Sequence, residues 1–212
     1  MSAPDLPAPT GFVPPPYPYA RLEDLRAEAA ARFGPGPVVD CSVGTPCDPP
    51  PPAVRSVLLA SDSVRGYPPS SGSGDFRQAA ADWLARRFGV TVDPATQVAA
   101  CVGTKELVAS VAHHLRLRSP QRDTVLYPEV SYPTYSMGAQ LAGCRARPVP
   151  AGPGGLDLAS VPEEEAARTL LLWTNSPSNP TGRLTDPEPV AAWARARGIP
   201  VFSDECYAEF TW

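Results

Sequence analysis

Lysine is almost absent from this chain of 212 residues: Lys105 is the only one, and arginine supplies the rest of the 18 basic residues. Acidic residues number 22, so the net charge is 18 − 22 = −4, which gives no electrostatic case for binding nucleic acid. No apolar run reaches the length of a membrane span. Hydrophobic residues nevertheless make up 43% of the chain, which is enough to bury a core.

Cysteine pairs, metal-ligand spacings and a secretory signal are also missing. The five cysteines form no CxxC pair, and none lies near a histidine at metal-ligand spacing, which indicates buried thiols in a reducing compartment. The first twenty residues contain neither the basic nor the apolar region of a signal peptide. We therefore expect a cytoplasmic protein without a metal.

Two nucleotide-binding fingerprints do not occur. The P-loop needs GxxxxGK[ST], whereas the lysine here follows a threonine in GTKE. The dinucleotide fingerprint GxGxxG fails because SGSGDF has no third glycine in place. A nucleotide-binding Rossmann domain is therefore disfavoured.

Proline, by contrast, is abundant, with 29 residues. The cluster at Pro4–Pro18 favours an extended arm, either a disordered tail or an arm that docks on a partner subunit. A second cluster, DPPPP at 48–52, indicates a stiff turn before the next helix.

Short apolar strands alternate with helices along the rest of the chain. Helices are predicted at 21–33, 53–61, 75–88, 105–117, 135–142 and 188–197, and strands at 38–43, 97–102, 124–127, 145–149, 170–174 and 200–204. This alternation predicts an α/β fold with a mostly parallel sheet covered on both faces.

Ligands of such sheets bind beyond the carboxyl ends of the strands, so the loops after the strands form the candidate site. Four of them carry unusual chemistry: GTKE, PEVSYPTY, NSPSNPTG and SDECY. GTKE opens a helix, where backbone N–H groups and the helix dipole favour a phosphate. Gly103 allows close approach and Thr104 adds a hydroxyl, although an ordinary helix cap is the alternative.

The other three loops offer an aromatic face, an amide and an acid. Stacking on a flat ligand and packing are equally supported for Tyr132, whereas Tyr135 fits core packing. An Asn in the rigid NSPSNPTG turn is a well-placed hydrogen-bond donor. Asp204 ends a buried strand, where a carboxylate is costly unless a cation such as a protonated ring nitrogen pairs with it. Tyr207 can reach the same ligand; the alternative is a surface acid beside a core tyrosine.

Taken together, SVGTPCDPPP, YPPSSGSGDFRQAAADWLARRFGV, GTKEL, SYPTY, NSPSNPTG and SDECY resemble the fold-type I pyridoxal-phosphate-dependent aminotransferases of class I/II. The likeness runs from about Arg21 onward and is greatest to the succinyldiaminopimelate aminotransferases of actinobacteria. It implies a three-layer αβα large domain that is incomplete. The implied organisation is an arm at 1–20, the start of the small domain at 21–47 and a partial large domain at 48–212.

The resemblance also implies contacts with the cofactor phosphate and the substrate. Gly103, Thr104 and Lys105 match the loop that holds the phosphate of pyridoxal 5′-phosphate. Tyr67 matches a tyrosine that reaches the phosphate of the other subunit's cofactor, which implies a homodimer. Gly44 matches a backbone contact to the substrate carboxylate.

The cofactor ring is assigned to residues of the three later loops. The resemblance implies that Tyr132 stacks on the ring and that Asp204 pairs with the ring nitrogen. Asn179 and Tyr207 match the residues that contact the ring 3′-oxygen. The acid would keep the ring nitrogen protonated, so that the ring can absorb electrons.

The family's catalytic lysine has no counterpart in this sequence. Relatives carry the lysine that forms a Schiff base with the cofactor downstream of the DECY segment, and no lysine follows Lys105 here. We therefore assign no catalytic residue and expect the N-terminal part of an aminotransferase, inactive by itself. The implied reaction moves an amino group between an amino acid and a 2-oxo acid, with N-succinyl-diaminopimelate and glutamate as substrates in lysine biosynthesis. Another substrate such as aspartate, a pyridoxal-phosphate lyase of the same fold, and an inactive truncated remnant stay open.

Overall fold

The computed structural model describes residues 11, 13, 19–34, 36, 39, 41–61 and 66–211. Contacts divide the chain into two compact units, one of residues 1–22 and 103–212 and the other of residues 23–102. Most of the predicted proline-rich arm lies outside the described residues. The predicted domain boundaries remain predictions.

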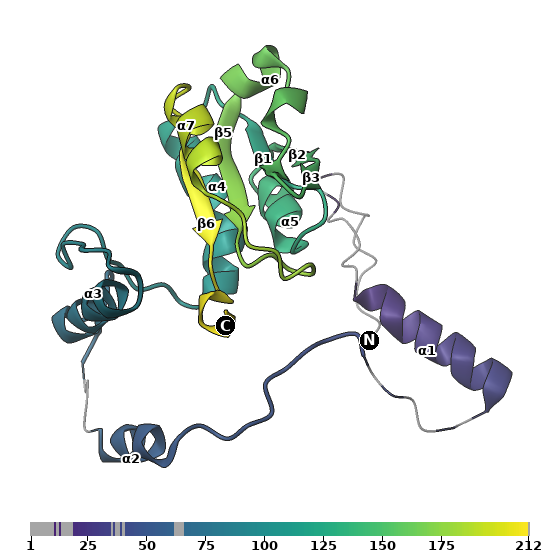
Figure 1. Ribbon diagram of the computed structural model, residues 1–212. Coiled ribbons are helices and arrows are strands. Elements are labelled where there is room, and N and C mark those ends of the chain that lie inside the picture. Colours follow the sequence, from purple (N-terminus) through teal and green to yellow (C-terminus); the bar gives the residue numbers. More distant parts are fainter. Residues whose placement is uncertain are drawn as a thin grey trace, which may run out of the picture. The chain divides into compact units, whose positions relative to one another are not determined.

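A four-stranded parallel sheet forms the centre of the first unit (Figure 1). In spatial order its strands are β2 (Arg145–Val149), β1 (Thr124–Pro128), β5 (Thr169–Asn175) and β6 (Val201–Asp204). The chain moves outward from β1 to β2 on one side and from β5 to β6 on the other. The strand order therefore reverses between β1 and β5, and a crevice for ligands is expected there.

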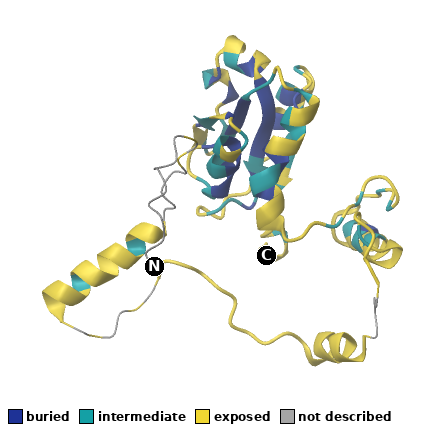
Figure 2. Ribbon diagram, turned by 180° about the vertical axis from the view of Figure 1, so that it is seen from behind, coloured by how far each residue is buried: buried dark blue, intermediate teal, exposed yellow. Residues whose placement is uncertain are grey.

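Helices cover both faces of this sheet, which confirms the predicted three-layer α/β fold. The helices on one face are α4 (Thr104–Arg118) and α5 (Thr134–Leu141), and those on the other are α6 (Glu163–Ala167) and α7 (Glu188–Arg195). Side chains alternate along β1, so Val125 packs toward α4 and α5 while Leu126 packs toward α7. Both side chains are fully buried, and Figure 2 shows the strands as the buried centre of the unit.

Gly138 allows α5 to approach α4 closely. A Cβ at this position would lie 2.8 Å from the carbonyl oxygen of Val108 and 2.9 Å from that of Ala109, both on α4. Only glycine fits such a backbone-to-backbone contact without displacement. The contact fixes α5, which carries Tyr135 toward the carboxyl edge of the sheet.

The opposite, amino edge of the sheet is joined by Arg122. Its guanidinium donates to the carbonyl oxygens of Thr169 and Gly198, each at 3.0 Å, and to that of Arg197 at 3.2 Å. These acceptors start β5 or precede β6, so one side chain holds the beginnings of neighbouring strands together. Arg168 and Asp123 form an ion pair at the same edge.

The second unit contains shorter, more exposed elements. They are most of α1 (Ala20–Phe33), α2 (Pro52–Ala60) and α3 (Gly74–Phe88). The N-terminus of α3 is capped, because Ser73 Oγ accepts from the N–H of Phe76 at 3.2 Å. No residue of α1 or α2 is buried (Figure 2).

Two predicted strands do not form among the described residues. Residues 97–102 are irregular and belong to the second unit, where no strand pairs with them in the part of the chain that is described. Of the strand predicted at 38–43, residues 38 and 40 lie outside the described set and residues 41–43 are not strand. A strand needs a partner to satisfy its backbone groups, and an apolar run alone does not supply one.

Candidate active site

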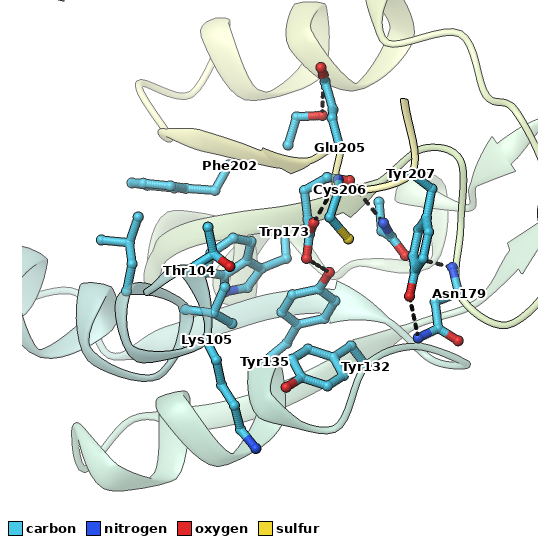
Figure 3. A pocket seen from close by; sticks show the side chains of 15 residues that line it. Thr104, Lys105, Tyr132, Tyr135, Trp173, Asn179, Phe202, Glu205, Cys206 and Tyr207 are labelled. Atoms are coloured by element: carbon cyan, nitrogen blue, oxygen red, sulfur yellow. Dashed lines mark hydrogen bonds between the residues drawn. The ribbon is translucent and has the colours of Figure 1, made fainter. Parts of the chain in front are cut away.

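A pocket of about 460 Å³ opens at the carboxyl edge of β1, β5 and β6, beside the N-terminus of α4 (Figure 3). Six of the nine predicted site residues line it: Thr104, Lys105, Tyr132, Asn179, Asp204 and Tyr207. Gly103 caps the adjoining helix. Gly44 and Tyr67 lie in the second unit and are not placed with respect to this pocket.

Asp204 is the last residue of β6 and is half-buried. Its Oδ2 accepts a hydrogen bond of 2.7 Å from the hydroxyl of Tyr135, and its Oδ1 accepts one of 3.3 Å from the N–H of Cys206. Both donors are neutral groups, so they orient the carboxylate without cancelling its charge. The acid therefore suits a cationic ligand atom better than an apolar one.

Tyr135 combines packing with a polar contact to the site. The prediction of core packing is confirmed, because the side chain is fully buried and stacks on Trp173 with ring centroids 4.9 Å apart. Burial, together with the hydrogen bond to Asp204, raises the pKa of the Tyr135 hydroxyl far above its usual range. The hydroxyl consequently remains a donor at every physiological pH.

Tyr132 presents a second aromatic ring at the pocket. It is half-buried and packs edge-on against Tyr135, with centroids 5.9 Å apart. The ring both contacts the core cluster and lines the pocket, so packing and access to a ligand are compatible.

Asn179 and Tyr207 lie next to each other at one side of the pocket and come from different loops (Figure 3). The side-chain Nδ2 of Asn179 donates to the hydroxyl oxygen of Tyr207 at 3.3 Å. Burial raises the pKa of Tyr207, so its hydroxyl is protonated at neutral pH. The two polar groups are close enough for a single ligand oxygen to contact both.

Backbone geometry at the start of α4 suits an anion. Gly103 is the N-cap residue and has φ 92°, a conformation that favours glycine. The first N–H groups of any helix have no acceptor within the helix, and the helix dipole adds positive potential there. Thr104 and Lys105 extend this end with a hydroxyl and an ammonium, and both line the pocket.

Sequence reasoning missed Asn175 and Cys206 as pocket residues and the contact of Tyr135 with Asp204. Asn175 ends β5 directly beside Asp204 in the parallel pairing, so the shared strand-end position was the available signal. The Cys206 thiol has its pKa raised to about 11, first by burial and then by the neighbouring Asp204 carboxylate. It is therefore a neutral group of the pocket wall rather than a nucleophile at pH 7.

The pocket combines an acid, an aromatic ring, a neighbouring amide and phenol, and the N-terminus of a helix. This combination suits a flat anionic ligand with a basic ring nitrogen. Sites of this kind at the switch point of an α/β sheet are typical of cofactor enzymes. No group of three or more metal-ligating side chains occurs in the portion of the chain that the structure describes. In the same portion, no helix is both long and apolar enough to cross a membrane.

Comparisons with known proteins identify the family. The model of the family described as aminotransferase class I and II matches residues 36–212, and the chain belongs to this family. A 4-dedimethylamino-4-oxo-anhydrotetracycline transaminase of Streptomyces rimosus is 42% identical over 93% of this chain and 52% of its own length. An LL-diaminopimelate aminotransferase of Desulforudis audaxviator is 39% identical over 92% of this chain and 51% of its own.

A solved structure shares the fold at similar coverage. The probable N-succinyldiaminopimelate aminotransferase of Thermus thermophilus matches with a TM-score of 0.73 and 31% identity, over 87% of this chain and 51% of that one. The chain thus spans about half the length of the curated relatives it matches.

Proteins of this family and fold depend on pyridoxal phosphate. The pocket fits that group chemically. The carboxylate of Asp204, which accepts from two neutral donors, is available for the ring nitrogen. A tyrosine ring lies at the pocket wall, and a helix N-terminus is available for the phosphate. The side-chain amide of Asn179 and the hydroxyl of Tyr207, whose Nδ2 and oxygen atoms lie 3.3 Å apart, offer two hydrogen-bonding groups for the 3′-oxygen of the ring.

Proposed function

We propose that this protein is a pyridoxal-phosphate-dependent aminotransferase that moves an amino group between an amino acid and a 2-oxo acid. The observation that carries the proposal is the carboxylate of Asp204, oriented by Tyr135 at the end of β6 and lining the same pocket as the Asn179–Tyr207 pair. When bound, the cofactor supplies an electron sink for the electrons left by the departing α-proton of the substrate.

The residues of the pocket have distinct parts in this proposal. Asp204 stabilises the protonated ring nitrogen, which keeps the ring electron-poor. Tyr132 stacks against the ring and excludes water from one face. Asn179 and Tyr207 hold the 3′-oxygen and so fix the rotation of the ring in its plane.

The phosphate and substrate contacts rest on the start of α4 and on the second unit. We assign the phosphate to the N–H groups and side chains of Gly103, Thr104 and Lys105. Tyr67 of a second subunit and Gly44 complete the site in a homodimer. These two assignments are supported by the resemblance of their sequence surroundings to the family.

The substrate we favour is N-succinyl-diaminopimelate, with glutamate as its amino-group partner. Two of the similar proteins act, by their names, on diaminopimelate or its succinyl derivative, whereas the Streptomyces rimosus relative acts on a tetracycline precursor. Complementation tests this proposal: a chimera in which this sequence replaces the matching half of a succinyldiaminopimelate transaminase should restore growth to a bacterium that lacks that enzyme. Failure to restore growth, with the protein expressed, would contradict the substrate assignment.

Cofactor binding by the purified 212-residue chain tests the site itself. We expect saturable, non-covalent binding of pyridoxal phosphate, which can be measured by the quenching of tryptophan fluorescence. Asp204→Asn should weaken binding by about tenfold or more, because hydrogen bonds and pairs to charged groups contribute about 1.5–3 kcal/mol. Asn keeps an acceptor for Tyr135, so the fold should persist.

Asp157→Asn is the matched control, since Asp157 is an exposed acid outside the pocket. It should bind the cofactor as the unchanged chain does. Equal affinity of the Asp204→Asn chain would remove the main support for the proposed function. We also expect no amino transfer by residues 1–212 alone, because Lys105 is the only lysine; measurable turnover would contradict that expectation.

A further inference from the structure

Asn175 links the two loops that carry the proposed ring contacts. The side chain is only 6% exposed and lies at the carboxyl end of the central strand β5. Its Nδ2 donates to the carbonyl oxygen of Asp204 at 2.8 Å and to that of Pro177 at 3.1 Å. Its Oδ1 accepts from the backbone N–H of Asn179 at 2.7 Å. One amide therefore contacts the backbones of both Asp204 and Asn179.

These contacts require an amide at this position. Nδ2 supplies two donors for two carbonyl oxygens, and Oδ1 supplies an acceptor for an N–H, so the group's main hydrogen-bonding capacity is matched. An Asp would have only acceptors and would face two carbonyl oxygens with negative charge. An apolar side chain would leave the backbone groups of Pro177 and Asn179 without this partner.

The pairing of β5 with β6 explains why the side chain of Asn175 can contact Asp204. Asn175 and Asp204 are register partners in the parallel pair of β5 and β6, and the N–H of Ser176 also donates to the carbonyl oxygen of Asp204 at 3.2 Å. The end of β6 is thus fixed to β5 by one backbone and one side-chain hydrogen bond. Asn179 is then held from the same side chain, four residues further along the chain.

We propose that Asn175 is a positioning residue that sets the place of Asn179 relative to Asp204, so that one ring can meet both. It acts through backbone contacts with these two residues and is not assigned a contact with the cofactor. The proposal rests on the proposed function, because it concerns how that site recognises the ring. Its specific consequence is that the contact of Asn179 with the 3′-oxygen contributes to affinity only while Asn175 holds the loop.

The test compares two ligands on the 212-residue chain: pyridoxal phosphate and its 3-deoxy analogue, which lacks the 3′-oxygen. The unchanged chain should prefer pyridoxal phosphate by about tenfold, the size expected for one to two net hydrogen bonds. Asn179→Ala should reduce the preference to about threefold, the share that the Tyr207 contact retains, and Asn175→Asp should reduce it to about the same value. Ser176→Ala is the matched control: its Oγ accepts from the N–H of Thr185 at 3.1 Å, in the same loop but away from Asn179, and the preference should remain.

The outcomes separate the inference from the proposed function. If the unchanged chain binds neither ligand, the proposed function fails and the inference fails with it. If the chain binds both but Asn175→Asp keeps the full preference, only the inference is overturned. A general loss of structure would lower both affinities equally, so a selective loss for pyridoxal phosphate supports positioning.

Amide hydrogen exchange in the unchanged chain keeps the inference testable if the Asn175 variants do not fold. The N–H of Asn179 should be protected, because Oδ1 of Asn175 accepts from it. Exchange of this amide at the rate of an unstructured peptide would overturn the proposal.

Discussion

The hydroxyl of Tyr135 donates a hydrogen bond of 2.7 Å to Oδ2 of Asp204, so a fully buried core residue is connected directly to the acid of the pocket. Tyr135 also stacks on Trp173, which packs in turn against Phe202 on β6 with ring centroids 5.3 Å apart. The orientation of Asp204 is therefore determined by the packing between α5 and the sheet. Core packing and site geometry depend on each other here.

Alkaline pH should destabilise the chain through Tyr135. The folded state holds the pKa of this hydroxyl far above its usual value of 10.0, whereas the unfolded chain can ionise it near that value. Its stabilising contribution is therefore complete below pH 10 and is lost as the pH rises further. The raised pKa of Cys206, from 9.0 to about 11, adds a loss of the same sign between those values.

Urea unfolding at several pH values measures this effect. Tyr135→Phe should lower the free energy of unfolding at pH 8 by about 1 kcal/mol, for one lost hydrogen bond, and should flatten the decline above pH 10. An identical decline in both proteins would show that Tyr135 ionises normally in the folded state.

Alkylation should be slow at Cys206. Because burial and the Asp204 carboxylate raise its pKa to about 11, very little thiolate exists at pH 8. After allowance for the greater nucleophilicity of a more basic thiolate, we expect iodoacetamide to react about tenfold more slowly than with an ordinary exposed thiol. Mass spectrometry of peptides can compare Cys206 with Cys101 in one reaction, since both thiols are free and both residues are exposed. Asp204→Asn should accelerate Cys206 alone; equal initial rates at both cysteines would contradict the shift.

Gly138→Ala should destabilise the first unit by about 1–3 kcal/mol or more, because the new methyl group would meet the backbone of α4 rather than a movable side chain. The readout is the midpoint of urea unfolding. Gly154→Ala is the matched control, since nothing lies within 4 Å of a Cβ there. A neutral effect of Gly138→Ala would mean that the two helices separate easily.

Reduction with borohydride should leave the chain's mass unchanged after mixing with an equimolar amount of pyridoxal phosphate. Lys105 offers the only lysine amine, and Figure 3 shows its side chain pointing away from Asn179 and Tyr207. Lys105→Arg should therefore bind the cofactor with nearly the same affinity, because a positive charge remains at the start of α4. Stoichiometric pyridoxyl labelling of Lys105 would refute non-covalent binding.

Much of the sheet could be predicted because β1, β5 and β6 are short, mainly apolar runs that end at loops of unusual composition. The strand predicted at 145–149 has those bounds in the structure, and the one predicted at 124–127 extends by one residue. The small β3–β4 hairpin (Ala151–Gly152 and Gly155–Leu156) and α6 were not predicted. Elements of two to five residues are too short to show a period.

The sequence could predict that the site residues share one pocket, but it could not predict the hydrogen bonds between them. Parallel strands place their carboxyl ends at one edge, and this brings Tyr132, Asn179 and Asp204 to one pocket. The hydrogen bonds of Tyr135 and Asn175 depend on side-chain orientation and on strand register, which composition does not encode. A tyrosine that packs in the core and a tyrosine that donates to an acid look the same in sequence.

Arg122 joins the beginnings of the strands at the edge opposite the pocket, with its guanidinium on the carbonyl oxygens of Thr169, Arg197 and Gly198. The contacts of Arg122 that hold the strands together and the side chains that line the pocket therefore lie at opposite ends of the same strands. A substitution of Arg122 can therefore change the stability of the sheet without changing any side chain that lines the pocket. Thermal tolerance and ligand preference are, in this unit, separately adjustable properties.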